Sequence, residues 1–147
     1  AVGLGCDRGT PLATLQDALR AALAQAGALA PDVVAAASIT LKADEAGLLA
    51  LAAKQGWAMT FFTPAQLAGV PVPNPSETVR RYTGTPSVSE AAALLAGARV
   101  FGHEQALPMT ALLVEKFKHR GADGRNATVS IARCDSFLFL TPERSTP

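Results

Sequence analysis

The chain has 147 residues, of which 49% are hydrophobic and 17% are charged, and its formal net charge is +1. These values predict one folded domain over residues 1–140 with a polar tail at 141–147, and they argue against an intrinsically disordered chain. The small net charge gives no electrostatic basis for binding nucleic acid, and no apolar run approaches the roughly 20 residues of a membrane span.

Strands and helices are predicted to alternate along most of the chain. AVGLG (1–5) has the character of a short buried strand, and VVAAASITL (33–41) is so continuously apolar that we expect a central strand of a parallel sheet. Further strands are predicted at WAMTFF (57–62) and RVFGH (99–103). Helices are predicted at 11–27, 44–56, 64–69, 75–82 and 87–98.

The C-terminal part has a different pattern. The segment 111–134 contains two strand-like runs around a turn with glycine and asparagine, which is typical of a β-hairpin. Together these elements predict an α/β fold, a three-layer α/β/α sandwich around a mixed sheet with a C-terminal β-hairpin. Ligands of such sheets bind at the carboxyl ends of the parallel strands, where loops lead into helices.

Four helix starts place a side-chain oxygen directly before a proline, at Thr10, Thr63, Asn74 and Thr85. This pattern predicts an N-cap followed by proline at the first helical position, although Ser87 competes with Thr85. Capping boxes would be completed by Gln66, Glu77 and Glu90. In one interpretation these residues only cap their helices. In the other, several helix starts converge to form an anion site, because free N–H groups and the helix dipole favour negative charge.

The loop GCDRGT (5–10) joins the first strand to the first helix. Its glycines suggest a dinucleotide-binding turn, but the second strand ends in Thr40, Leu41 and Lys42 where that site needs an acid, so we reject this interpretation. No G-x-x-x-x-G-K-[ST] motif is present in the sequence either. We expect this loop to offer backbone donors and Arg8, whose guanidinium suits a ligand carboxylate.

The segment LKADE (41–45) carries charge at the end of the second strand. In one interpretation Lys42 is a cation facing the site, and Asp44 or Glu45 is a general base. In the other, these residues are only the charged start of the next helix, with Asp44 as its cap. Both interpretations stay open.

Strict alternation in the hairpin predicts Val114, Lys116 and Lys118 on one strand face, against Glu115, Phe117 and His119 on the other. The lysines either close over an anionic ligand or form a solvated edge that resists aggregation.

Thiol and metal chemistry find little support in the sequence. Cys6 and Cys134 have no metal-type spacing and are expected to be free thiols, and Cys6 is a nucleophile only if His103 or His119 approaches it. We expect no metal and no cofactor. The N-terminal segment lacks the basic start and cleavage site of a signal peptide, which predicts a cytoplasmic protein.

Several of these motifs coincide with one family. GCDRGT, LKADEAGLLALA, VPNPSETV, TGTPSVSEAAALLAG and TVSIAR resemble, in this order, the family formed by the C-terminal domain of CbiG and the stand-alone CobE proteins of cobalamin biosynthesis. The resemblance runs from Gly3 to about Arg133, and the length resembles the stand-alone form. The segment 115–133 is longer and more basic than the corresponding stretch of the family.

This resemblance implies a site for a corrin-ring intermediate, whose carboxylate side chains surround an apolar macrocycle. It implies a carrier or accessory protein, which we favour, with two alternatives: a cobalt-precorrin lactone hydrolase using Asp44 or Glu45, or a scaffold that holds other cobalamin-pathway enzymes. The ligand-binding residues that the motifs and the resemblance predict are Gly5, Cys6, Arg8, Gly9, Thr10, Lys42, Asp44, Glu45, Asn74, Ser76, Thr83, Gly84, Thr85, Ser87 and Lys116.

Overall fold

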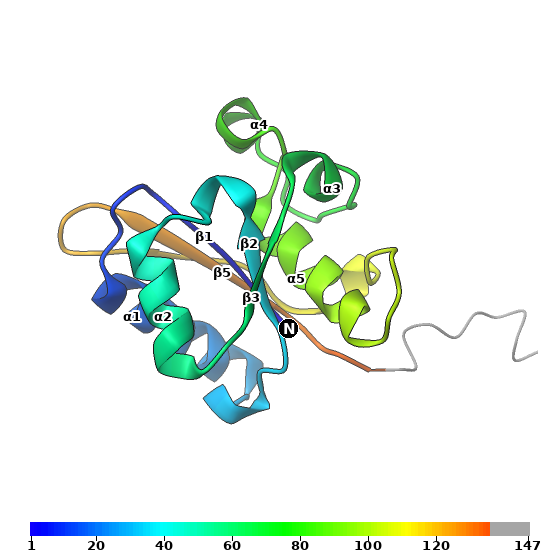
Figure 1. Cartoon of the computed structure of the whole chain (residues 1–147), viewed down its shortest axis with the longest axis horizontal. Helices are drawn as coiled ribbons and strands as arrows, with labels where there is room; N and C mark the ends of the chain where they lie inside the picture. Colours follow the sequence, from blue (N-terminus) through cyan, green and yellow to red (C-terminus); the bar gives the residue numbers. More distant parts are fainter. Residues whose placement is uncertain (136–147) are drawn as a thin grey trace, which may run out of the picture.

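The computed structural model describes residues 1–135, and Figure 1 shows how its helices and strands are arranged. The strands are β1 (Val2–Cys6), β2 (Ala36–Ile39), β3 (Met59–Phe62), β4 (Leu112–Arg120) and β5 (Asn126–Ala132). The α-helices are α1 (Leu12–Ala26), α2 (Ala46–Gln55), α3 (Pro64–Ala68), α4 (Glu77–Thr83) and α5 (Val88–Val100). Short 3-10 turns are η1 (Ala30–Asp32), η2 (Thr40–Lys42) and η3 (Met109–Ala111). The predicted polar tail lies outside the described residues.

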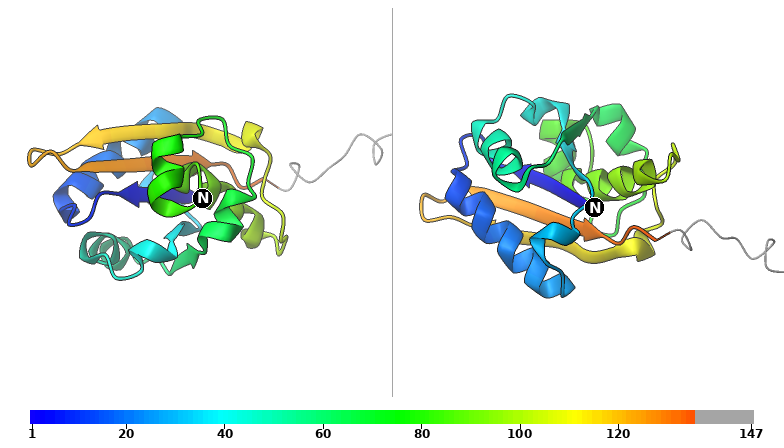
Figure 2. Two further views of the ribbon diagram at one scale, coloured as in Figure 1. Left: turned by 90° about the horizontal axis from the view of Figure 1, so that it is seen from above. Right: turned by 60° about the horizontal axis from the view of Figure 1, so that its bottom comes forward.

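The strands form one mixed sheet in the order β3-β2-β1-β5-β4. β1, β2 and β3 are parallel, whereas β5 runs antiparallel to both β1 and β4. Helices α1 and α2 cover one face of the sheet, and α3 and α5 cover the other (Figures 1 and 2). The predicted α/β sandwich with a C-terminal hairpin is therefore confirmed. No helix in residues 1–135 is both long and apolar enough to cross a membrane.

Each face of the sheet buries its own hydrophobic cluster. Leucines of α1 and α2 pack against Val2 and Leu4 of β1. On the opposite face, the alanine-rich α5 lies so close to β1 that a Cβ built on Gly3 would come within 1.9 Å of the Ser89 carbonyl oxygen. The absence of a side chain at Gly3 therefore allows the first turns of α5 to lie directly on β1.

The strand predicted at 99–103 does not form, so this prediction was wrong. Arg99 and Val100 belong to the last turn of α5. The chain then turns at Gly102, whose φ of 75° is in the left-handed region. The N–H of His103 bonds to the Ala98 carbonyl oxygen and so helps to end the helix. The strong helical tendency of the alanine-rich segment extends into this apolar run, while β1 already has a partner strand on each side.

A β-bulge in β4 changes the alternation predicted for the hairpin. Two residues separate Val114 from Phe117, whereas only one separates their partners on β5. Val114 and Phe117 consequently both belong to the hydrophobic cluster on the α1 side of the sheet. Glu115, Lys116 and Lys118 line a pocket instead. The prediction that Val114 shares a strand face with Lys116 and Lys118 was wrong, because the extra residue of the bulge interrupts the alternation of side chains between the two faces.

Of the four predicted helix caps, Thr63 forms as expected, in a complete capping box with Gln66. The caps predicted at Thr10 and Asn74 are wrong, because Thr10 bonds to loop carbonyl oxygens and Asn74 to acidic side chains. Of the two competing caps for α5, Ser87 and not Thr85 occupies the N-cap position, but its hydroxyl bonds to Glu90 and not to a helix N–H. The residues at the N-cap positions of α1, α4 and α5 are Pro11, Ser76 and Ser87. The boxes predicted with Glu77 and Glu90 do not form either.

Candidate functional site

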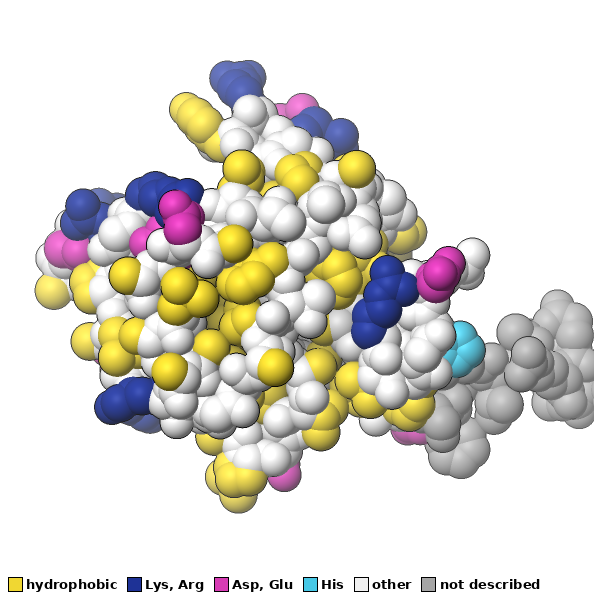
Figure 3. Space-filling view, in the orientation of Figure 1, with side chains coloured by type: hydrophobic (Ala, Val, Ile, Leu, Met, Phe, Trp, Pro, Cys, Tyr) yellow, Lys and Arg dark blue, Asp and Glu magenta, His cyan; other side chains and the backbone are white. Residues whose placement is uncertain are grey.

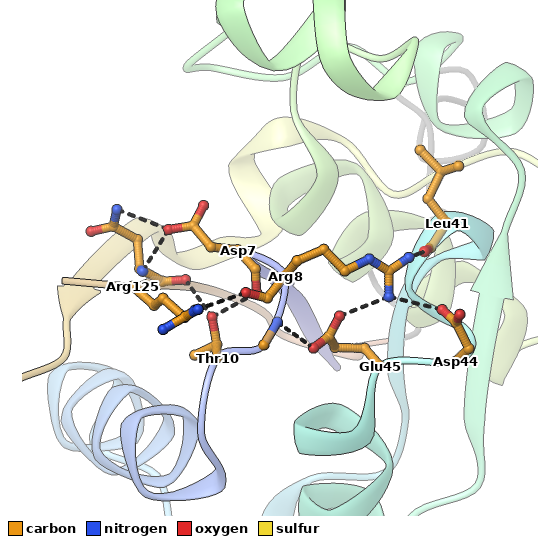
Figure 4. A network of polar contacts seen from close by, with 9 residues as sticks. Asp7, Arg8, Thr10, Leu41, Asp44, Glu45 and Arg125 are labelled. Atoms are coloured by element: carbon orange, nitrogen blue, oxygen red, sulfur yellow. Dashed lines mark hydrogen bonds and ion pairs between the residues drawn. The ribbon is translucent and has the colours of Figure 1, made fainter. Parts of the chain in front are cut away.

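Arg8 links the loop after β1 to the start of α2 (Figure 4). Its Nη1 donates to Asp44 Oδ1 at 2.9 Å and to Glu45 Oε2 at 2.8 Å, and its Nη2 donates to the Leu41 carbonyl oxygen. The other carboxylate oxygen of Glu45 accepts the Gly9 N–H at 2.8 Å. These contacts bring together two of the predicted ligand-binding loops, those that follow β1 and β2.

The two acids in this network have different surroundings. The side chain of Asp44 is 82% exposed, whereas that of Glu45 is 5% exposed. Hydrogen bonding to Arg8 lowers the pKa of Asp44. Glu45, not Asp44, occupies the N-cap position of α2, so the interpretation of Asp44 as the cap was wrong. Arg8 is engaged by the chain's own carboxylates, and its predicted contact with a ligand carboxylate stays a prediction.

The hairpin holds the same loop from its other side. Asp7 Oδ2 accepts the backbone N–H of Asn126 at 2.8 Å, and Arg125 Nε donates to the Arg8 carbonyl oxygen at 2.9 Å. The hydroxyl of Thr10 donates to the Asp7 carbonyl oxygen at 2.7 Å. The loop is therefore fixed both to α2 and to the start of β5, which gives its backbone a defined position.

A second polar cluster is centred on Glu90, in the first turn of α5, which is 0% exposed. Its carboxylate accepts hydrogen bonds from Asn74 Nδ2 at 2.6 Å, from the Asn74 backbone N–H at 3.3 Å and from Ser87 Oγ at 3.0 Å. Asn74 Nδ2 also donates to Glu115 Oε1 at 2.9 Å. This cluster connects the segment before α4, the start of α5, and β4.

Lys116 and Lys118 lie beside this cluster in a shallow pocket of about 400 Å³, which Asn74, Pro75, Ser76 and Glu115 complete. Neither lysine forms an ion pair with any residue in 1–135. Burial lowers the pKa of Lys116, and the charge of Lys118 lowers it further. The negative charge of Glu90 acts in the opposite direction. The pocket therefore offers cations to the anionic groups of a ligand.

The TGTPS segment connects α4 to α5 and uses its own side chains internally. Thr85 and Ser87 are 0% exposed. Thr83 Oγ1 lies 2.7 Å from the Val79 carbonyl oxygen and 3.0 Å from that of Thr85. Gly84 ends α4 with a φ of 82°, in the left-handed region. These hydroxyls already have partners, and the backbone N–H groups of Gly84 and Thr85 donate to the Arg80 carbonyl oxygen and to Thr83 Oγ1. The ligand-binding role expected for this segment stays a prediction.

Gly5, near the end of β1, lies against both β5 and the start of α5. A Cβ built on Gly5 would lie 2.6 Å from Thr128 Oγ1 and 3.8 Å from Val88 at the start of α5. Thr128 is the pairing partner of Lys118 on β4. The absence of a side chain at Gly5 therefore leaves room for the Thr128 side chain beside β1. From the sequence we expect the four loops at 5–10, 42–45, 74–76 and 83–87 to line one cleft, and this stays a prediction.

Cys6 does not have the surroundings of a reactive thiol. Burial raises its pKa to about 11, although the charge of Lys42 acts in the opposite direction. The described groups that influence this thiol do not include His103 or His119. Within residues 1–135, no three His, Cys, Asp or Glu side chains are grouped to hold a metal ion.

Helix α4 projects from the rest of the domain and contains no buried residue. Tyr82 is 78% exposed, and Arg80 and Arg81 precede it in the last turn. Figure 3 shows charged side chains gathered over α4 and over the loop after β1, with a mainly hydrophobic or uncharged surface between and below them. This side of the molecule thus combines charged groups with apolar surface.

Sequence reasoning missed five polar side chains of the two clusters, those of Asp7, Glu90, Glu115, Arg125 and Asn126. Glu90 was expected only as half of a capping box, yet it is the one acidic residue of the alanine-rich α5 and lies in its first turn. That position was the available signal. The contacts of Glu115 and Asn126 join segments far apart in the sequence, so no local sequence pattern predicts them.

The fold and the site define a class of protein, an α/β domain with polar clusters where the parallel strands end. The family described as "Cobalamin synthesis G C-terminus" matches residues 1–132. The chain therefore belongs to this family, which confirms the resemblance seen in its motifs.

Two curated relatives are similar to this chain. "Cobalt-precorrin-5A hydrolase" of Priestia megaterium is 41% identical over 95 residues, which are 65% of this chain and 25% of that protein. "Protein CobE" of Sinorhizobium sp is 37% identical over 100 residues, which are 67% of this chain and 65% of that protein. The chain thus spans a quarter of the first relative and just under two thirds of the second.

Two solved structures share the fold. The crystal structure of CobE, a protein from the cobalamin (vitamin B12) biosynthetic pathway, matches with a TM-score of 0.67 and 32% identity over 88% of this chain and 87% of that chain. The cobalamin biosynthesis protein chiG from Agrobacterium tumefaciens matches with a TM-score of 0.55 and 25% identity over 89% of this chain and 96% of that chain.

Proposed function

We propose that the chain binds a corrin-ring intermediate of cobalamin biosynthesis through the carboxylates of that ring, as a carrier or accessory protein. The observation that carries this proposal is the position of Lys116 and Lys118, which line the pocket beside Asn74 and make no ion pair within the described residues. A lysine ammonium on its flexible stem is a donor that can follow the acetate and propionate arms of such a ring.

The macrocycle itself needs apolar contacts beside these cations. Leu41, in η2 directly after β2, is 45% exposed, and Tyr82 of α4 is 78% exposed. Figure 4 shows Leu41 above the Arg8 network, and Figure 1 shows α4 on the same side of the domain. We propose that the ring contacts Leu41 and Tyr82 while its carboxylates reach Lys116 and Lys118.

Hydrolysis of a lactone is the second candidate, and the similarity to the cobalt-precorrin-5A hydrolase favours it. This reaction needs a base that activates water. The pKa of Asp44 is lowered by Arg8, which makes it a weaker base, and both oxygens of Glu45 already accept hydrogen bonds. We therefore rank binding without turnover first.

Gel filtration of the chain mixed with a lactone-containing precorrin separates the two candidates. A carrier elutes as a coloured complex, and mass spectrometry of the released ligand finds it unchanged. Product that disappears in Asp44→Asn or Glu45→Gln would favour the hydrolase. A ligand that neither co-elutes nor reacts would refute both candidates.

A further inference from the structure

We propose that the side-chain oxygen of Asn74 selects a ligand edge that carries a hydrogen-bond donor, such as a primary amide or a hydroxyl, next to a carboxylate held by the lysines. This inference rests on the proposed function and specifies the kind of ligand. It assigns different chemistry to two neighbouring parts of one pocket, and it makes Asn74 a residue that determines specificity.

The orientation of the Asn74 amide follows from its two acidic neighbours. Its Nδ2 donates to Glu90 Oε2 at 2.6 Å and to Glu115 Oε1 at 2.9 Å, so both amide hydrogens are used. A flipped amide would place Oδ1, which has no hydrogen to donate, against two carboxylates. The amide is therefore held with nitrogen toward the acids, and Oδ1 accepts no hydrogen bond from residues 1–135.

Both carboxylates that hold the amide have supports of their own. Glu90 is 0% exposed and also accepts hydrogen bonds from Ser87 and from the Asn74 backbone. Glu115 lies in the β-bulge of β4, where the Ser130 hydroxyl donates to its backbone carbonyl oxygen. The bulge explains how Glu115 and Lys116, adjacent in sequence, both line the same pocket.

The pocket consequently presents two acceptors, Asn74 Oδ1 and the Glu115 carboxylate, beside the two lysine donors. Lys116 and Lys118 favour a carboxylate, whereas a carboxylate placed at Asn74 Oδ1 would bring two acceptors together without a hydrogen between them. A primary amide or hydroxyl donates to this oxygen. A corrinoid whose side chains are all ionised is thus predicted to bind less tightly than one in which a particular carboxylate has become an amide or is replaced by a hydroxyl.

The test uses dicyanocobyrinic acid, in which every peripheral acid is free, and the mixture of its monoamides, applied together to immobilised protein. The retained fraction is identified by chromatography and mass spectrometry. We expect wild type to enrich one or a few monoamide isomers over the free acid by about fivefold, the ratio that one hydrogen bond supplies. Asn74→Ala should retain the compounds without this enrichment, and Lys54→Ala should behave as wild type.

A second variant covers the case in which Asn74→Ala does not fold. Glu115→Ala leaves Glu90 in place but removes one of the two acceptors that orient the amide, so the enrichment should fall. Equal retention of the free acid and all monoamides by wild type would overturn this inference and leave the proposed function standing. Retention of none of these compounds would contradict the proposed function itself, and the inference with it.

Discussion

Arg8 and Glu45 form the shortest ion pair across the two loops that follow β1 and β2, with Arg8 Nη1 2.8 Å from Glu45 Oε2. Asp44 contacts the same nitrogen at 2.9 Å but is 82% exposed, whereas Glu45 is 5% exposed. One guanidinium thus joins a buried and a solvated carboxylate. Because water can replace the donors of only the solvated acid, the two acids should contribute differently to stability.

Replacing Glu45 with alanine should lower the free energy of unfolding by about 1–3 kcal/mol, because the Gly9 N–H and Arg8 lose their buried acceptor. Asp44→Ala is the matched control, and its urea midpoint should stay close to that of wild type because an exposed ion pair contributes little. Equal shifts of the two urea midpoints would contradict the prediction that the buried Glu45 contributes more to stability than the exposed Asp44.

The contact of α5 with β1 leaves no room for a side chain at Gly3. Gly3→Ala would place a Cβ within 1.9 Å of the Ser89 carbonyl oxygen, so we expect a loss of about 3 kcal/mol or more, or a failure to fold. Gly69→Ala is the control, because the nearest atom to its Cβ lies at 3.8 Å and its φ is −78°. Thermal unfolding measures both, and a stable Gly3→Ala protein would contradict this packing.

Cys6 should resist alkylation because burial raises its pKa to about 11 from the usual 9.0. A thiol with a higher pKa holds less of the reactive thiolate at pH 8, by roughly 100-fold for a shift of about 2 units. Mass spectrometry of iodoacetamide-treated Cys134→Ser protein measures the rate at Cys6 alone. If Cys6 is alkylated as fast as a cysteine in an unstructured peptide, its pKa is not raised, and the prediction of an unreactive thiol is contradicted.

Ligand binding should weaken at alkaline pH before an ordinary lysine loses its proton. The pKa of Lys116 is lowered, chiefly by burial, so the ammonium is lost on raising the pH at a value below 10.5. Since a carboxylate ligand prefers the charged form, affinity is retained below the lowered pKa and falls as the pH rises through it. Lys116→Arg should keep its affinity to higher pH, and an identical pH profile for both proteins would contradict this role of Lys116.

Much of the fold could be predicted because each parallel strand is a short apolar run, and Gly27 and Gly56 end helices where expected. The strand expected at 99–103 failed because an apolar run of this kind fits the end of a helix equally well. The bulge at Glu115 and Lys116 was beyond prediction, since it depends on the pairing of β4 with β5 and not on either segment alone.

The candidate site was predicted as a set of loops but not as a set of contacts. The prediction treated Arg8 as available to a ligand, because nothing local shows that Asp44 and Glu45 reach it from the next strand end. It likewise treated Asn74 as a cap, although the buried Glu90 on α5 holds it. Such contacts join residues many positions apart, so they follow from the assembled sheet and not from spacing along the chain.

The central claim is that Lys116 and Lys118 hold the carboxylates of a corrinoid. Its most direct test is a titration of dicyanocobyrinic acid, followed in the visible spectrum, into wild type, the double variant Lys116→Gln/Lys118→Gln, and Lys54→Gln. Lys54 lies in the last turn of α2 and serves as the control for the loss of positive charge. We predict that the double variant raises the Kd about tenfold or more, as expected for lost hydrogen bonds between charged groups, and that Lys54→Gln leaves it unchanged. A double variant that binds as tightly as wild type would contradict the account.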